Sequence, residues 1–565
     1  MSAASSELPE RAAAPSFRLA DRSPLDRAGL VVAVVSVAAL VGLAAGLGRR
    51  LWFFSDDWNI LADYHDGGLL EPFNGHLSLL PAGAYQLVAR TLGTGSYLPY
   101  RLLGLAALVI LGFQLIRALS ERLAWSPVGS WYVALAVSAV MWNPRGVTNV
   151  MFPFLMNFSI PIAALLAIWW HLDRGRLRND VAASVWLAAA LATSGLGVMT
   201  LGAVVVELVL SRASWRRWLV LSPGPVLWAV WFLSNRGSSA WSTDLVEVLS
   251  YAGRMLLGAT TSLVAGWELG GVLLAVALAG VVALGALRWR SLDARALAAL
   301  AAPLGFALST ALTRLDIVPQ IPPDELRYSW SIAAYLVVAV VVLWRPDEWV
   351  RSHRPVALGA SALAAVVVVI GAVQLVDDMG EWADTVAAAR PGLTAVLRAT
   401  EAIGAERIDP ERVLPLSYVP VTAGGYLDAV AAVGSPVDGA PARVASENGL
   451  NADQLLVEQL DVSLRPASGG CAVPGVSTTL GAEPFDVAAG AELRIRDVPV
   501  DAPEPALSRF AAQDYAVALT WPVPPAELGP EGLALVLPDD VEGSATTALP
   551  YRLTLPAGAT LEVCG

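Results

Sequence analysis

Apolar residues in the first two thirds of the chain occur in long runs that polar segments interrupt, with no period-two alternation. A run of about 17–20 apolar residues is long enough to cross a bilayer as a helix. The pattern predicts about eleven such spans. They lie near 28–48, 100–118, 129–143, 154–170, 181–194, 195–211, 218–234, 269–287, 296–312, 328–344 and 355–375. A weaker apolar stretch at 77–90 is typical of a helix at the membrane interface.

The pattern changes after residue 375. Residues 377–404 have apolar positions at helical spacing, and 405–465 are mixed. From about 466, short segments alternate apolar with polar or small residues and are separated by Pro and Gly, which predicts a small β-sandwich. We therefore expect an α-helical polytopic membrane domain over 28–375, with a disordered cytoplasmic N-terminus over 1–27. An extracytoplasmic α+β domain over 376–565 would follow, with its β-sandwich at 466–565.

Composition separates the same two parts. The 565 residues are 56% hydrophobic and 15% charged, which is too apolar for an ordinary soluble protein. Residues 376–565 carry 27 Asp and Glu against 10 Arg, a net charge of −17. The remaining 22 acidic residues and 27 arginines give residues 1–375 a net charge of +5. We expect no nucleic-acid partner for this acidic chain.

Arginines predict the sidedness. With the N-terminus in the cytoplasm, the inner loops 117–128, 171–180, 211–218, 288–295 and 345–354 carry more arginines than the outer loops. This bias is typical of cytoplasmic loops. It predicts a multi-pass plasma-membrane protein whose long first loop, 49–99, and whose residues 376–565 lie outside.

The cysteines give an independent argument. Cys471 and Cys564 are the only two, and both lie in the part assigned to the outside. An oxidising compartment favours a disulfide that would join the first strand of the sandwich to the last. The alternative is a pair of unpaired buried thiols.

An acidic pair, Asp56 and Asp57, follows the first predicted span and precedes Trp58. Carboxylates at the mouth of a span are costly to place there and favour a functional site. Two carboxylates that share a site raise the pKa of one of them. Such a pair could deprotonate an acceptor hydroxyl or hold a divalent cation, Mg²⁺ or Mn²⁺, while the Trp58 ring packs on a sugar. The alternative for Ser55 or Asp56 is a helix N-cap.

Two further segments hold candidate phosphate ligands. His76 could bind a phosphate or transfer a proton, or simply hydrogen-bond to the backbone. Arg327 and Tyr328 begin the tenth span on its outer side, where an arginine can hold a lipid phosphate. The alternatives are an ion pair of Arg327 with Asp324 or Glu325, and interface anchoring by Tyr328.

These features together resemble the multi-span glycosyltransferases of the GT-C superfamily, the class of protein O-mannosyltransferases and aminoarabinose transferases. The resemblance covers about residues 28–375. Its motifs are the acidic pair, a Gly-His-x-x-x-x-Pro stretch and a late Glu-x-Arg-Tyr; the residues are Asp56, Asp57, Gly75, His76, Pro81, Glu325, Arg327 and Tyr328. The chain departs from it in having Asp-Asp where many relatives have Asp-Glu, and its acidic C-terminal part matches no subfamily.

The resemblance implies transfer of a sugar from a polyprenyl-phosphate donor to an extracytoplasmic glycan, lipid or protein of the cell envelope. Asp56 or Asp57 would activate the acceptor, with or without a metal, and Arg327 and His76 would hold the donor phosphate. Two other functions stay open. A transporter or flippase of a lipid-linked glycan needs ionisable residues inside the spans, where Glu207 is one of few. A non-catalytic anchor would present residues 376–565 as a binding module.

Overall fold

The computed structural model describes residues 23–564 with gaps. The gaps are 67, 124–128, 236–243, 288–293, 316–320, 344–353, 406–407, 415, 417–419, 438–463, 468–470, 472–476, 480–484, 489, 510–516, 519–520, 529 and 538–550. The chain divides into two compact units. The first comprises Met1–Leu51, Gly67–Val88 and Tyr97–Asp384, and the second comprises Trp52–Asp66, Ala89–Ser96 and Thr385–Gly565.

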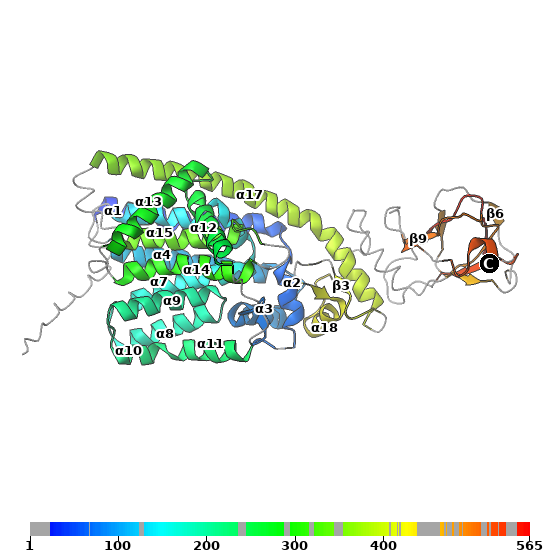
Figure 1. The fold of residues 1–565 in the computed structure, drawn as a ribbon, viewed down its shortest axis with the longest axis horizontal. Coiled ribbons are helices and arrows are strands. Elements are labelled where there is room, and N and C mark those ends of the chain that lie inside the picture. The colour runs from blue at the N-terminus through cyan, green and yellow to red at the C-terminus, as the bar shows by residue number, and fades with distance from the viewer. Residues whose placement is uncertain are drawn as a thin grey trace, which may run out of the picture. The chain divides into compact units, whose positions relative to one another are not determined.

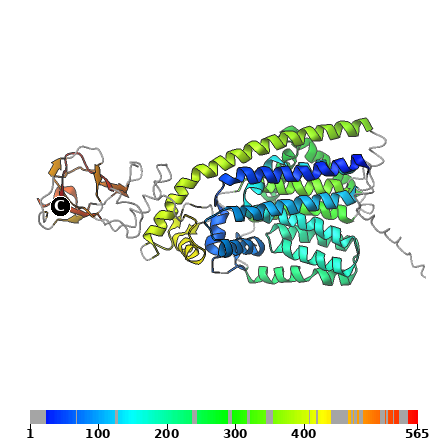
Figure 2. The ribbon, with the colours of Figure 1, turned by 180° about the vertical axis from the view of Figure 1, so that it is seen from behind.

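The first unit is helical (Figures 1 and 2). Its helices are α1 (Pro24–Leu47), α4 (Leu98–Arg122), α5 (Gly129–Met141), α6 (Val147–Met151), α7 (Met156–Leu172), α8 (Leu177–Leu191), α9 (Leu196–Leu210), α10 (Trp215–Leu221), α11 (Pro223–Ser234), α12 (Leu245–Ser262), α13 (Glu268–Leu287), α14 (Ala294–Arg314) and α15 (Leu326–Leu343). Two helices, α3 (Leu79–Leu92) and α17 (Arg354–Ile403), begin in the first unit and end in the second. Short 3₁₀ turns, η2 (Gly48–Arg50), η3 (Pro144–Gly146) and η4 (Pro153–Leu155), join some of the helices.

Among the described residues, six helices are long and apolar enough to cross a membrane. They are α1, α4, α14, α15, α7 with the preceding turn η4, and the apolar part of α17. Within the bundle α1 packs against α4 and α5, α7 against α4 and α8, and α14 against α9, α12 and α15. A buried arginine, Arg101 of α4, joins three of these elements: its guanidinium donates to the carbonyl of Ala44 at 2.9 Å and to the carbonyls of Val150 and Met151.

The structure is mainly helical, with a small C-terminal sheet region, and the six long apolar helices among the described residues are consistent with the predicted helical membrane protein. A helix covers each predicted span, but the described helices do not confirm that eleven of them cross. The segment predicted at 218–234 is broken at Ser222 into α10 and α11, where Pro223 begins a new helix. Helix α12 was not predicted, because Glu247 and Arg254 interrupt its apolar residues. Helix α1 already begins at Pro24, inside the segment predicted to be disordered, and residues 1–22 lie outside the described part.

The second unit contains α2 (Asp56–Asp63), the end of α17, a two-stranded sheet of β3 (Val413–Leu414) and β4 (Val421–Thr422), and α18 (Ala423–Val433). Helix α2 packs against α18 and β4. The acidic pair therefore belongs to a cluster of elements contributed by both the first loop and the C-terminal part. The sequence predicted a simpler boundary at residue 376.

The C-terminal region contains two antiparallel sheets. One has the order β10-β9-β12-β7 and the other β5-β11-β8-β13-β6. The strands are β5 (Arg465–Pro466), β6 (Ser477–Thr479), β7 (Phe485–Val487), β8 (Glu492–Arg496), β9 (Ala506–Arg509), β10 (Val517–Ala518), β11 (Leu533–Val536), β12 (Tyr551–Thr554) and β13 (Thr560–Cys564). A shared core includes Leu493, Ile495, Leu507, Leu535 and Leu553. Inward-facing apolar residues from both sheets are what the predicted sandwich requires.

The disulfide between Cys471 and Cys564 is present. Its position differs slightly from the prediction, because Cys471 follows β5, the first strand, and precedes β6. The bridge therefore joins the end of β13 to the chain segment that leads into β6, the strand that pairs with β13.

Candidate functional site

The candidate site lies at the end of the first unit where α14 ends and α15 begins; we call this the loop end. A two-residue hairpin brings His76 there. Strands β1 (Pro72–Phe73) and β2 (His76–Leu77) are joined by Asn74 and Gly75, whose φ angles are +50° and +78°. Positive φ at both central residues is the geometry that Asn-Gly favours in tight hairpins. Phe73 packs on Phe154 with ring centroids 5.1 Å apart and so anchors the hairpin to the bundle.

His76 faces an arginine that the sequence did not single out as a ligand. Nη2 of Arg314 lies 3.2 Å from Nε2 of His76 and 3.4 Å from the carbonyl oxygen of Asn74. Burial, and then the positive charge of Arg314, lower the pKa of His76 from 6.5 to about 4. The imidazole is therefore neutral at physiological pH, and Nε2 accepts a hydrogen bond from Arg314 while the guanidinium keeps its charge.

Gly195, between α8 and α9, gives the imidazole its space. A Cβ atom at this position would lie 2.9 Å from both Nδ1 and Cε1 of His76. The start of α3, directly after the hairpin, is also tied to this turn, because the amide of Leu80 donates to the carbonyl of Ala192 at 2.8 Å. The turn between α8 and α9 thus fixes where His76 meets Arg314.

Helix α12 adds Tyr251 to the loop end. Its hydroxyl donates to the carbonyl oxygen of Ile321 at 2.7 Å. Burial, followed by the negative charge that Tyr328 would carry if ionised, raises the pKa of Tyr251 to about 12, although the positive charges of Arg254 and Arg314 oppose this rise. Tyr251 therefore remains a neutral phenol at physiological pH.

The Glu-x-Arg-Tyr segment contributes both a local pair and a buried ring. Nε of Arg327 lies 3.9 Å from Oε1 of Glu325, so the predicted alternative of a local ion pair is present. Tyr328 is buried, with ring centroids 5.8 Å from Phe306 and 6.2 Å from Phe158. Its hydrophobic surroundings make Tyr328 chiefly a packing residue at the start of α15.

Asn157 and Phe158, at the start of α7, connect the turn that contacts His76 with the start of α15. Ser194 Oγ donates to the carbonyl of Asn157 at 2.8 Å, next to the glycine that contacts His76, while Phe158 packs on Tyr328. In the described part of the chain, Asn157 Oδ1 and Ser329 Oγ are buried without a hydrogen-bond partner. Polar atoms of this kind are rare in native structures and often belong to ligand sites. We call His76, Asn157, Tyr251, Arg314, Glu325, Arg327 and Tyr328 the loop-end cluster.

The predicted acidic pair lies in the second unit, where its two members differ. Helix α2 begins at Asp56, and Ser55 at the N-cap position makes no side-chain capping bond. Asp57 is fully buried, and its Oδ2 accepts from the amide of Phe54 at 3.1 Å. Asp56 is partly exposed. Adjacent residues on a helix do not face each other, so the two carboxylates do not point into one shared site.

Trp58 is placed differently from the prediction. Only 1% of its surface is exposed, and its ring lies 5.2 Å from Trp52, 5.4 Å from Phe53 and 6.3 Å from Tyr426. Protein atoms cover the faces that would pack on a sugar. Trp58 instead anchors α2 to α18 through its ring contact with Tyr426.

Few side chains in the described ranges could coordinate a metal ion together. Within the described ranges no three His, Cys, Asp or Glu side chains gather into a cluster that could hold a metal ion. A Mg²⁺ ion commonly uses only one or two protein carboxylates together with substrate phosphates and water. Asp56 fits that mode, whereas Asp57 already accepts a backbone hydrogen bond. The predicted divalent cation stays a prediction.

Arg314, Tyr251 and Gly195 are the members of the site that the sequence did not reveal. A recognised Asn-Gly hairpin signal would have placed His76 on a turn. No local signal indicates that Arg314 meets it, because the two residues are 238 positions apart. Comparisons with known proteins add nothing to these assignments: no family model, curated protein or solved structure matches the chain.

Proposed function

We propose that this protein is a membrane glycosyltransferase that moves a sugar from a polyprenyl-phosphate donor to an acceptor on the extracytoplasmic side. The observation that carries the proposal is the pair formed by Arg314 and His76 at 3.2 Å. Arg314 has a neutral imidazole and a backbone carbonyl as its hydrogen-bond partners, and no described carboxylate forms an ion pair with it. A guanidinium in that state retains the charge and the donors that bind a phosphate.

The proposed topology places the loop end on the extracytoplasmic side of the membrane. Eleven spans with the N-terminus in the cytoplasm would place the loop end, α2 and residues 376–565 outside. The arginine bias of the loops supports this orientation. The disulfide between Cys471 and Cys564 supports an oxidising compartment for the C-terminal part.

The proposed reaction is an inverting displacement at the anomeric carbon. The acceptor oxygen forms the new bond to that carbon, and the bond between the carbon and the phosphate oxygen breaks. The electron pair leaves with the polyprenyl phosphate, and the acceptor proton goes to a carboxylate acting as general base. Arg314 would stabilise the charge that develops on the leaving phosphate, and Arg327 is a second candidate for this role.

Asp56 is the proposed base. It is partly exposed, whereas Asp57 is buried and held by the amide of Phe54. A base must reach a substrate hydroxyl within hydrogen-bond distance, which a fully buried carboxylate cannot do without rearrangement. Where the reaction uses a divalent cation, Asp56 would be its protein ligand.

Asparagine variants of α2 test the proposal. In the purified full-length protein supplied with polyprenyl-phosphate sugars and envelope acceptors, Asp56→Asn should lower the rate of transfer by about 10²–10⁴-fold with an unchanged unfolding transition. Asp57→Asn should instead lower stability by about 1–3 kcal/mol, because a buried acceptor is weakened. Asp63→Asn, at the exposed end of the same helix, is the matched control. Full activity of the Asp56→Asn protein would sink the assignment of the base.

A further inference from the structure

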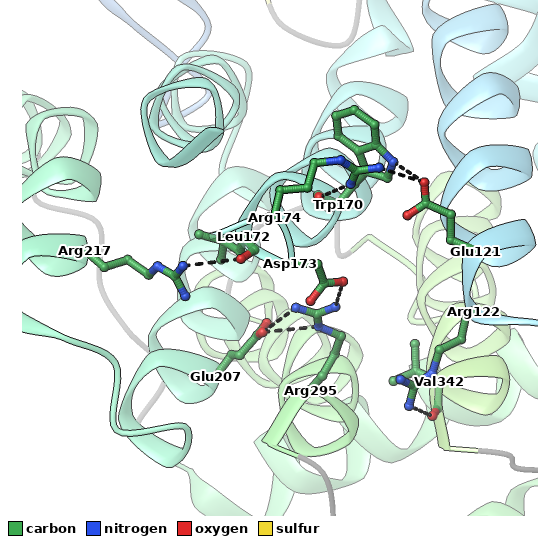
Figure 3. A network of polar contacts seen from close by, with 10 residues as sticks. All are labelled: Glu121, Arg122, Trp170, Leu172, Asp173, Arg174, Glu207, Arg217, Arg295 and Val342. Carbon is green, nitrogen blue, oxygen red and sulfur yellow. Dashed lines mark hydrogen bonds and ion pairs between the residues drawn. The ribbon is translucent and has the colours of Figure 1, made fainter. Parts of the chain in front are cut away.

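Opposite the loop end, where α4 and α7 end, one indole contacts two guanidinium groups. Cζ of Arg117 lies 3.7 Å and Cζ of Arg174 lies 3.3 Å from the ring centroid of Trp170. Glu121 binds two of these three side chains (Figure 3). Its Oε1 atom accepts a hydrogen bond from Trp170 Nε1 at 2.7 Å and another from Arg174 Nη2 at 2.8 Å. One carboxylate oxygen thus neutralises Arg174 and fixes the indole.

Arg117 is left in a different state. Its Nε and Nη2 atoms are buried, and neither has a hydrogen-bond partner in the part of the chain that the structure describes. Buried N–H groups of a charged side chain are costly when they are unpaired. The neighbouring Glu121 oxygen already accepts two hydrogen bonds. The guanidinium is therefore held in place by stacking, and two of its donors lack an acceptor in the described part of the chain.

The surface of α4 indicates which anion. Leu102, Val109 and Phe113 are 55%, 47% and 57% exposed, and Arg117 follows Phe113 by four residues. Residues at these spacings lie on one face of a helix. Arg117 also lies over the ring of Phe113, at 5.5 Å from its centroid. On a helix that crosses a bilayer, an exposed apolar face contacts acyl chains, so a lipid chain along this face leads directly to Arg117.

We propose that Arg117, stacked on Trp170, binds the phosphate of an anionic phospholipid whose acyl chain lies along the exposed face of α4 from Leu102 to Phe113. A planar guanidinium matches a phosphate through two parallel hydrogen bonds. Tryptophan is enriched at the depth of the headgroups, which suits the position of Trp170 near the end of α7. The site is separate from the loop-end cluster and does not depend on glycosyl transfer.

Native mass spectrometry of the full-length, delipidated protein tests the proposal. The protein is mixed with equal amounts of phosphatidylglycerol and phosphatidylcholine that carry the same acyl chains, and the retained lipid is counted. The wild type should retain phosphatidylglycerol preferentially. Arg117→Gln should weaken this retention about tenfold, the loss expected for one hydrogen-bonded charged group. Arg178→Gln changes an exposed arginine in the first turn of α8; it is the matched control and should retain the lipid as the wild type does.

Arg117→Lys covers the case in which the glutamine variant fails to fold. It keeps the charge but loses the planar fork, so it should retain severalfold less phosphatidylglycerol than the wild type while its thermal unfolding is unchanged. Equal retention of both lipids by the wild type would overturn the proposal, as would equal losses for Arg117→Gln and Arg178→Gln. Inorganic phosphate that binds as tightly as phosphatidylglycerol would overturn the assignment to a lipid.

Discussion

Helix α14 carries an arginine near each end, and the surroundings of the two differ. At one end, Arg295 is paired twice: Nη1 lies 2.5 Å from Asp173 Oδ2 and Nη2 lies 2.6 Å from Glu207 Oε1 (Figure 3). At the other end, Arg314 contacts the neutral His76 and the carbonyl of Asn74. The same residue type is therefore charge-neutralised at one end of the helix and retains its charge at the other.

The difference separates a structural arginine from one suited to binding. Arg295 lies at the N-terminus of α14, where the helix dipole disfavours a cation, and two carboxylates offset this effect. Arg314 lies in the last turn, where the dipole favours a cation without any acidic partner. Only the second arrangement leaves net positive charge for an anionic ligand. Glu207, the acidic residue that the transporter alternative invokes, is one of the two partners of Arg295.

The largest effect is expected on the paired side. Arg295→Gln should lower the free energy of unfolding by about 3–5 kcal/mol, because it leaves two carboxylates without their cation in a site where Arg295 is only 13% exposed. Denaturant unfolding of the purified protein in detergent measures this loss. Arg217→Gln is the control at the same end, since the pair of Arg217 with Asp180 is longer, at 3.3 Å, and should contribute at most about 1 kcal/mol. Equal losses would contradict the special role of Arg295.

The converse change tests the unpaired side. Arg314→Gln should lower kcat/KM for a polyprenyl-phosphate sugar by about 10²-fold, because it removes a charged donor from the leaving phosphate. Because the buried ring of His76 would lose its hydrogen-bond donor, the free energy of unfolding should fall by about 1–3 kcal/mol, which is less than for Arg295→Gln. Arg327→Gln should have a smaller effect, since Glu325 already lies 3.9 Å from Arg327 and offsets part of its charge. An Arg314→Gln protein that unfolds easily and keeps full turnover would show that Arg314 is a structural arginine and does not bind the donor phosphate.

Gly195 offers a finer way to disturb the loop end. Gly195→Ala places a Cβ atom 2.9 Å from the His76 ring and should displace it, lowering stability by about 1–3 kcal/mol together with activity. Gly202→Ala is the control in α9, because nothing lies within 4 Å of the added Cβ, and it should be neutral or slightly stabilising. Thermal unfolding and turnover of both variants give the answer. Identical behaviour would mean that the ring position does not matter.

The pH dependence of stability tests the contact between His76 and Arg314. Because the pKa of His76 falls from 6.5 to about 4 on folding, the unfolded chain binds more protons between these values. The stability contributed by the neutral imidazole is present above pH 6.5 and is lost as the pH falls toward 4. His76→Asn should therefore show a shallower loss of stability over this window. Arg314→Gln should narrow the pH range over which stability is lost, because the pKa of His76 would be lowered less without the positive charge of Arg314. Part of the range should remain, since burial is the larger cause of the lowered pKa. Parallel curves for the wild type and His76→Asn would exclude this titration.

The fold was predictable to the extent that local patterns determine it. Long apolar runs and the change to short alternating segments near residue 466 each correspond to an observed helix or sheet region. Helix α12 was not predicted because its charged residues, Glu247 and Arg254, interrupt the run of apolar residues. Trp58 was assigned to a sugar from its neighbours in sequence, but it is buried against Tyr426, a residue far along the chain. Exposure of an aromatic ring depends on such distant contacts.

The sequence by itself determined the two-part organisation, the candidate chemistry of Asp56, His76 and Arg327, and the cysteine pair, because these depend on composition and local spacing. The tertiary structure decided which charges are neutralised. Arg295 and Arg314 look alike in the sequence, and only the packing of α14 against α9 and the hairpin reveals their partners. The physical reason is that the state of a charge depends on the groups within a few ångströms, and the fold brings these groups together from distant parts of the chain.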